Sequence, residues 1–144
     1  MVAFAIAILV ENSLEGIIEN QRERNYARFV KNVDGLTNTF RGPVEECAII
    51  SVEKDDDECL NRVFEEYRNQ FGSLIKLFGY ESHMLELYQY WQFDLEYWYN
   101  AKKIQMQYTD TELIQSKLEE ILRIQQKAKQ ERLDPDFANF IESK

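Results

Sequence analysis

The side chains best suited to acid–base or metal chemistry lie near the start of one aromatic segment. His83 is the only histidine of the chain, and Glu86 follows it at a spacing of one helical turn. Asp94 lies farther along the same segment. Carboxylate di-iron bundles need Glu-x-x-His twice, together with further glutamates, whereas this chain has the reverse order once. We therefore expect no metal, no cofactor and no catalytic residue, and keep a small helical-bundle metal-dependent enzyme using His83, Glu86 and Asp94 as the alternative.

Asp94 lies near the apolar side of this segment, away from its polar stripe. A buried carboxylate needs a partner, so we expect Asp94 to meet a tyrosine hydroxyl, an arginine or a cation from another chain.

An acidic run, Asp55-Asp56-Asp57-Glu58, invites comparison with a calcium-binding loop. The position that such a loop reserves for glycine holds Leu60 here, and Cys59 is a poor ligand for a hard cation. The helical pattern that follows also begins inside the supposed loop. We interpret the run as a solvated helix cap in which one aspartate serves as the N-cap.

Cys47 and Cys59 are the only two cysteines. Two cysteines give no disulfide framework, and no clustered basic residues mark either one as a low-pKa thiol. We expect both to be small buried hydrophobic residues of a cytoplasmic protein in a reducing interior. The apolar start, residues 1–10, has no basic region before it and is far shorter than the roughly 20 residues of a membrane span, so we expect no membrane association.

The net charge of −9 is unevenly distributed. Residues 1–42 and 100–144 are each neutral, and the whole imbalance lies in residues 43–99. Such a negative field disfavours nucleic acid and anionic membranes and attracts a basic protein partner. The basic stripe of Arg24, Arg28 and Lys31, with Arg22 close by, could touch phosphate, but glutamates interrupt it, and it reads as ordinary solvated surface.

The segment from Tyr88 to Tyr99 is crowded with aromatic residues. On a helix they cover almost the whole circumference and leave only a narrow polar stripe. A helix of this kind is wrapped by neighbouring helices or completes its burial against another chain, and aromatic residues are also what interfaces favour. We therefore expect a homo-oligomer.

The spacing of apolar residues predicts helices that position these groups. They cover residues 2–40 (one helix or two), a segment after Pro43, residues 60–78, residues 81–108, a segment after a capping box at Thr109–Glu112, and a short docking helix after Asp134-Pro135. The prediction is one all-α domain over 1–144, a bundle of five or six helices. The alternative is one short β-strand or hairpin near 2–10 and 47–53.

The function that these observations favour is a non-catalytic intracellular interaction module, an adaptor or inhibitor that docks a basic protein surface through its acidic central segment. A phage- or plasmid-type inhibitor is one form of this idea, and a structural homo-oligomer subunit is a further alternative. The expected partner-binding residues are Asp55, Asp56, Asp57, Glu58, Glu65, Glu66, Tyr90, Trp91, Asp94 and Trp98.

Overall fold

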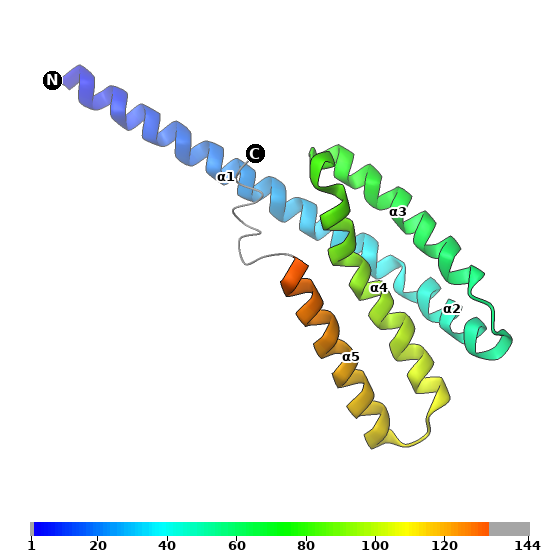
Figure 1. The fold of residues 1–144 in the computed structure, drawn as a ribbon. Helices are drawn as coiled ribbons and strands as arrows, with labels where there is room; N and C mark the ends of the chain where they lie inside the picture. Colours follow the sequence, from blue (N-terminus) through cyan, green and yellow to red (C-terminus); the bar gives the residue numbers. More distant parts are fainter. Residues whose placement is uncertain (1, 133–144) are drawn as a thin grey trace.

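The computed structural model describes the backbone of residues 2–132 and the side chains of residues 21–130 (Figure 1). Its helices are α1 (Val2–Thr39), α2 (Arg41–Lys54), α3 (Glu58–Phe78), the 3₁₀ helix η1 (Glu81–His83), α4 (Met84–Gln107) and α5 (Thr111–Arg132). The all-α prediction is confirmed. The docking helix expected after Asp134-Pro135 lies outside the described residues.

The alternative of a strand near 2–10 and 47–53 is wrong, because both ranges are helical. The β-branched residues of 47–53 had suggested a strand. However, the buried positions of α2 are Val44, Cys47, Ala48 and Ser51. This i, i+3, i+4, i+7 spacing is the period of a helix with one face toward the core.

A sharp break at Phe40 separates α1 from α2. The Phe40 amide donates to the Thr37 carbonyl (3.1 Å), and the Val44 amide donates to the Phe40 carbonyl (3.0 Å). The sequence placed this break at Gly42-Pro43, but Pro43 lies inside the first turn of α2. The missing N–H of Pro43 costs nothing there, because the first amides of a helix have no intrahelical partner.

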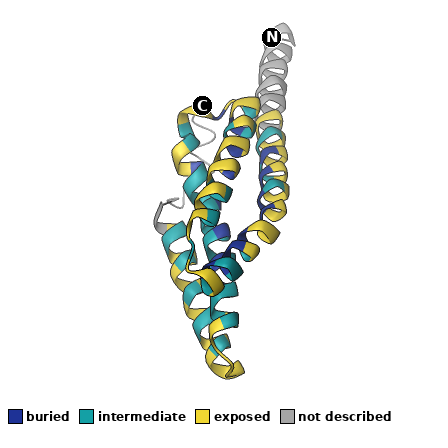
Figure 2. Cartoon of the chain, turned by 90° about the vertical axis from the view of Figure 1, so that its right-hand side faces the viewer, coloured by how far each residue is buried: buried dark blue, intermediate teal, exposed yellow. Residues whose placement is uncertain are grey.

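Helix α4 occupies the centre of the bundle, with α1, α2 and α3 packed on it and α5 lying along its other side (Figure 1). No residue from Leu87 to Ile104 is exposed, which Figure 2 shows as a nearly continuous buried or half-buried helix. The prediction that neighbouring helices wrap the aromatic segment is therefore confirmed.

Aromatic rings fill the core between α1, α3 and α4. The ring of Phe29 meets Tyr80 at 4.9 Å, Trp91 at 5.8 Å and Phe71 at 6.4 Å between centroids, with interplanar angles of 69°, 86° and 73°. This edge-to-face arrangement is the one that aromatic quadrupoles favour. The hydroxyls of Tyr67 and Thr37 lie 2.9 Å apart and satisfy each other within this core.

The helix ends follow the expected chemistry with small shifts. Gly79 adopts the left-handed conformation at the end of α3, with φ of 79°, as predicted. The N-terminus of α5 is capped by Asp110, whose Oδ1 accepts from the Glu112 amide at 3.0 Å. The capping box predicted at Thr109–Glu112 is therefore wrong: the N-cap is Asp110, and its N3 position holds Leu113, which has no side-chain acceptor to complete a box.

Candidate functional site

The two cysteines form a disulfide, Cys47–Cys59, with their Cα atoms 5.4 Å apart. The expectation of two unpaired buried cysteines is therefore wrong. The disulfide forms because α2 and α3 pack in a register that brings the two cysteines together. The connection of Asp55, Asp56 and Asp57 turns the chain back, so that Cys47 on α2 meets the first turn of α3. Two cysteines do not make a framework, but one pair is enough for one bridge.

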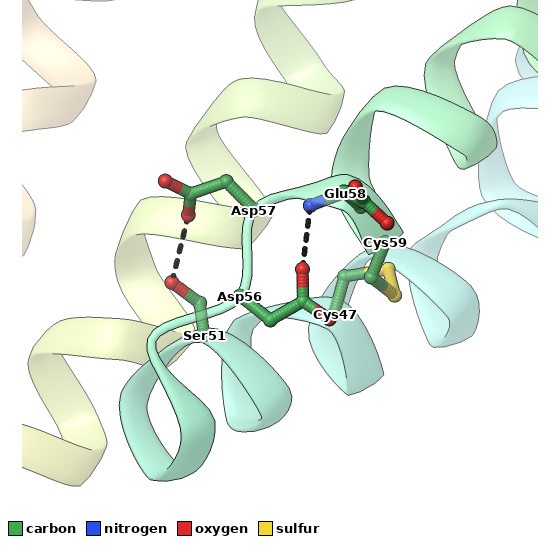
Figure 3. Close-up of a disulfide and its surroundings, with 6 residues drawn as sticks. All are labelled: Cys47, Ser51, Asp56, Asp57, Glu58 and Cys59. Carbon is green, nitrogen blue, oxygen red and sulfur yellow. Dashed lines mark hydrogen bonds between the residues drawn. A yellow bond between two sulfur atoms is a disulfide. The ribbon is translucent and has the colours of Figure 1, made fainter.

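The three-residue connection between α2 and α3, together with Glu58, is the acidic turn (Figure 3). The backbone of Asp55 adopts the left-handed helical conformation, with φ of 52°, and its amide donates to the Ser51 carbonyl at 2.9 Å. The carboxylate of Asp56 accepts from the Glu58 amide at 2.9 Å. The Ser51 hydroxyl donates to Asp57 Oδ1 at 3.1 Å. The N-cap of α3 is an aspartate as expected, Asp57, but its side chain makes no capping bond to the helix, and the bond to the Glu58 amide comes from Asp56.

The disulfide closes the loop that contains this acidic turn. In Figure 3 the Asp56 side chain points along the α3 side of the turn toward Glu58, whereas the Asp57 side chain points the opposite way, toward Ser51. Asp55 and Glu58 are both exposed, and within the described residues neither carboxylate forms a hydrogen bond or an ion pair. Two carboxylates of the turn, those of Asp56 and Asp57, therefore form hydrogen bonds within it, and those of Asp55 and Glu58 face solvent.

Further exposed carboxylates lie along α3, with the exposed Arg62 between them and the turn. Glu65 lies seven residues after Glu58, on the same line of the helix and about 10 Å farther along its axis. Glu66 is also exposed and accepts from the Gln70 amide group at 3.4 Å. These residues, named as partner-binding from the sequence, share one accessible part of the fold.

The aromatic partner-binding candidates occupy different surroundings. Trp91 lies in the core, 3% exposed, and its indole N–H donates to Asp34 Oδ1 at 3.0 Å. Trp98 lies under the Arg41 guanidinium, and the Lys129 ammonium lies 4.5 Å from the centroid of the Tyr90 ring. Trp91 is therefore inaccessible to a partner in this fold, and the chain's own cations cover the faces of the other two rings.

Asp94 has its partner within the same chain. Lys129 Nζ of α5 donates to Asp94 Oδ1 at 2.7 Å, with the lysine side chain more buried than the carboxylate. The same ammonium lies over Tyr90. The cation was expected from an arginine or from another chain, and the structure supplies a lysine 35 residues away.

The candidate acid–base residues do not converge. His83 ends η1 and is half-buried, and Glu86 is exposed in the first turn of α4. Asp94 lies about 12 Å beyond Glu86 along the helix axis. In the described part of the chain no group of three or more His, Cys, Asp or Glu residues could hold a metal ion. The calcium-loop alignment also fails, because α3 begins at Glu58 and Cys59 is in the disulfide.

The shifted pKa values belong to core tyrosines. Burial raises the pKa of the Tyr67 phenol above its ordinary value, and the Thr37 hydrogen bond opposes this only in part. Burial likewise raises the pKa of Tyr80, and that of Tyr88 despite the nearby Arg68 guanidinium. These shifts are the mark of phenols held neutral in a core and point to no reactive group.

The described surface includes two open hollows. One, of about 330 Å³, lies at the start of α4, where Arg68 and Tyr88 meet Glu81 and Glu86. The other lies on α1 beside the basic stripe and is lined by Arg28 and Lys31, with Asn32, Gly35 and Leu36. Both are open to solvent rather than enclosed.

No protein-family model, curated protein or solved structure matches the chain. Among the described residues, no helix has both the length and the apolar character that crossing a bilayer requires.

Proposed function

We propose that this protein is a non-catalytic helical binding protein that presents the acidic turn to a basic surface on a protein partner. The observation that carries this proposal is the closure of the turn by the Cys47–Cys59 disulfide, with Asp55 and Glu58 exposed on it. A binding segment that is already held in one conformation loses little entropy on association. Adaptor or inhibitor activity is the form of function that such a surface supports.

The charge of the turn supports a basic partner rather than a nucleic acid. Five carboxylates, those of Glu53, Asp55, Asp56, Asp57 and Glu58, lie within six positions and include one lysine between them, Lys54. Complementary charge speeds encounter and selects partners more than it adds raw affinity. The expected affinity is therefore modest and falls as salt increases.

The experiment measures binding of a fluorescent octalysine peptide to the full chain over a series of salt concentrations. The test variant is Asp55→Asn/Glu58→Gln, which keeps the bonds of Asp56 and Asp57. The control is Glu112→Gln/Glu120→Gln, which makes the same change in net charge at exposed positions of α5. Weaker binding by the first variant than by the second supports the proposal.

Two results would refute it. Equal loss in both variants would mean that octalysine responds only to net charge. Binding that is indifferent to ionic strength, or absent at low salt, would remove the acidic turn as a docking surface.

The disulfide also bears on location. The sequence predicts a cytoplasmic protein with two unpaired cysteines, whereas the cysteines form a disulfide, and disulfides persist mainly in oxidising compartments. We propose that the chain folds in such a compartment. Alkylation of protein from its native source with a maleimide–polyethylene glycol reagent tests this proposal. Unmodified protein would support an oxidising compartment. Addition of two polymer chains would show that both thiols are reduced, as expected in the cytoplasm.

Self-association stays a prediction. The cations over Trp98, Tyr90 and Tyr88 complete the cover of α4 within one chain, so the aromatic helix no longer requires a second copy. Light scattering over a dilution series decides the question, with a constant monomer mass at micromolar concentration excluding a homo-oligomer.

A further inference from the structure

Helix α5 leaves one side open. It lies at the edge of the bundle and packs chiefly on α4 (Figure 1). Its half-buried residues Ile114, Leu118 and Ile121 lie on one arc, whereas Leu113 and Ile124 are 42% and 55% exposed. Their separation of eleven residues brings both to within about 20° of one line along the helix. Two large apolar side chains thus stand on the same uncovered side.

The end of that side nearest the C-terminus is basic. Ile124 lies between Arg123 and Lys127, both exposed. The stretch from Arg123 to Arg132 contains four basic residues and one acidic residue. An acidic apolar segment would fit Ile124, and the surroundings of Leu113 near the other end of α5 lack this concentration of positive charge.

We propose that the chain's own C-terminal segment, residues 133–144, covers the Ile124 side of α5. From the sequence alone, Asp134-Pro135 in this segment has the pattern of an N-cap followed by the first residue of a helix. Phe137, Phe140 and Ile141 follow at i, i+3 and i+4, which is one apolar face. With three acidic residues against one lysine, the segment carries the charge opposite to that of the end of α5.

The length of the C-terminal segment determines which of Leu113 and Ile124 it can contact. Ile124 lies eight residues before Arg132, or about 12 Å along the helix. The helix that the sequence pattern predicts over 135–144 would be about 15 Å long, so a reversal at Asp134-Pro135 would bring its apolar face opposite Ile124. Leu113 lies about 28 Å from Arg132, beyond the end of the segment. The proposed contact therefore includes Ile124 and excludes Leu113.

A second copy of the chain is a poorer occupant of the same surface. A specific protein–protein interface buries about 800 Å² per partner, whereas this side of α5 offers two apolar side chains, each already about half covered. A segment joined directly to α5 meets the surface at an effective concentration in the millimolar range or above. A small contact area is therefore enough for the C-terminal segment to dock on α5.

The experiment is zero-length carbodiimide cross-linking of the full chain, mapped by mass spectrometry in an equal mixture of ¹⁴N- and ¹⁵N-labelled protein. We expect links from Lys127 to Asp136 or Glu142 within one chain. Phe137→Ser/Phe140→Ser lowers the yield on the order of tenfold, because two large apolar groups leave the contact. Ile124→Ser lowers it as well, and the matched control Leu113→Ser leaves it unchanged.

Three results would overturn the proposal. Links between ¹⁴N and ¹⁵N chains would assign the surface to a second copy. A yield unaffected by Phe137→Ser/Phe140→Ser would show tethering without docking. Equal yields from Ile124→Ser and Leu113→Ser would place the segment elsewhere. Circular dichroism of each variant verifies that the helices are intact.

Discussion

Reduction of the Cys47–Cys59 disulfide should destabilise the protein by a calculable amount. The bond joins residues 12 apart in sequence. Cross-linking a loop of this length removes chain entropy from the unfolded state and is worth about 3 kcal/mol. For a chain of 144 residues the entropy of unfolding is roughly 300 cal/mol/K. The expected fall in Tm is therefore about 10 °C.

The assay is thermal unfolding followed by circular dichroism at 222 nm, with and without a phosphine reductant. The variant Cys47→Ala/Cys59→Ala should melt near the reduced wild type and should not respond to the reductant. This pairing separates the cross-link from any effect of side-chain size at Cys47, which is 1% exposed. A reductant-induced shift below about 2 °C, or an equal shift in the double variant, would refute the entropic reasoning.

Further outcomes follow from the core, the ion pair and the helix ends. Phe29→Ala, at a fully buried position, should cost about 3–5 kcal/mol in urea unfolding, whereas Leu77→Ala, at a side chain 76% exposed, should cost almost nothing. Because burial raises the pKa of Tyr67 in the folded state, the folded chain keeps a proton that the unfolded chain loses, so stability should fall as pH rises above about 10; Tyr67→Phe should flatten that fall. A double-mutant cycle of Asp94→Asn and Lys129→Met should give a coupling of no more than about 1 kcal/mol, because the carboxylate is 39% exposed. Gly79→Ala should cost about 1 kcal/mol from backbone strain at φ of 79°, since no atom lies within 4 Å of the added Cβ; an unchanged urea midpoint would contradict this account.

Local features of the fold were predictable because their causes are local. The period of apolar residues in α3, the left-handed Gly79 and the aromatic circumference of α4 each depend on a few adjacent positions. The run 47–53 was ambiguous, because short apolar segments with β-branched residues suit either a strand or a helix. Packing against α4 and α3 decided in favour of the helix.

The candidate site was less predictable because it depends on register between helices. The acidic run was visible in the sequence, but the disulfide that closes it requires α2 and α3 to return at one particular offset. A spacing that leaves three residues between two helical patterns, with a cysteine on each side, was the available signal. The partners of Asp94 and Trp91 lie 35 and 57 residues away, and no local pattern indicates Lys129 or Asp34.

Both tryptophans of the chain, Trp91 and Trp98, lie on α4. Intrinsic emission excited at 295 nm therefore comes from the central helix alone, and it responds to the α1 and α2 side chains that contact the two indoles. The two indoles differ in surroundings, one in the core beside Phe29 and the other under the Arg41 guanidinium. A single-tryptophan variant of either kind would thus serve as an optical probe of one defined depth in the bundle, without any added label.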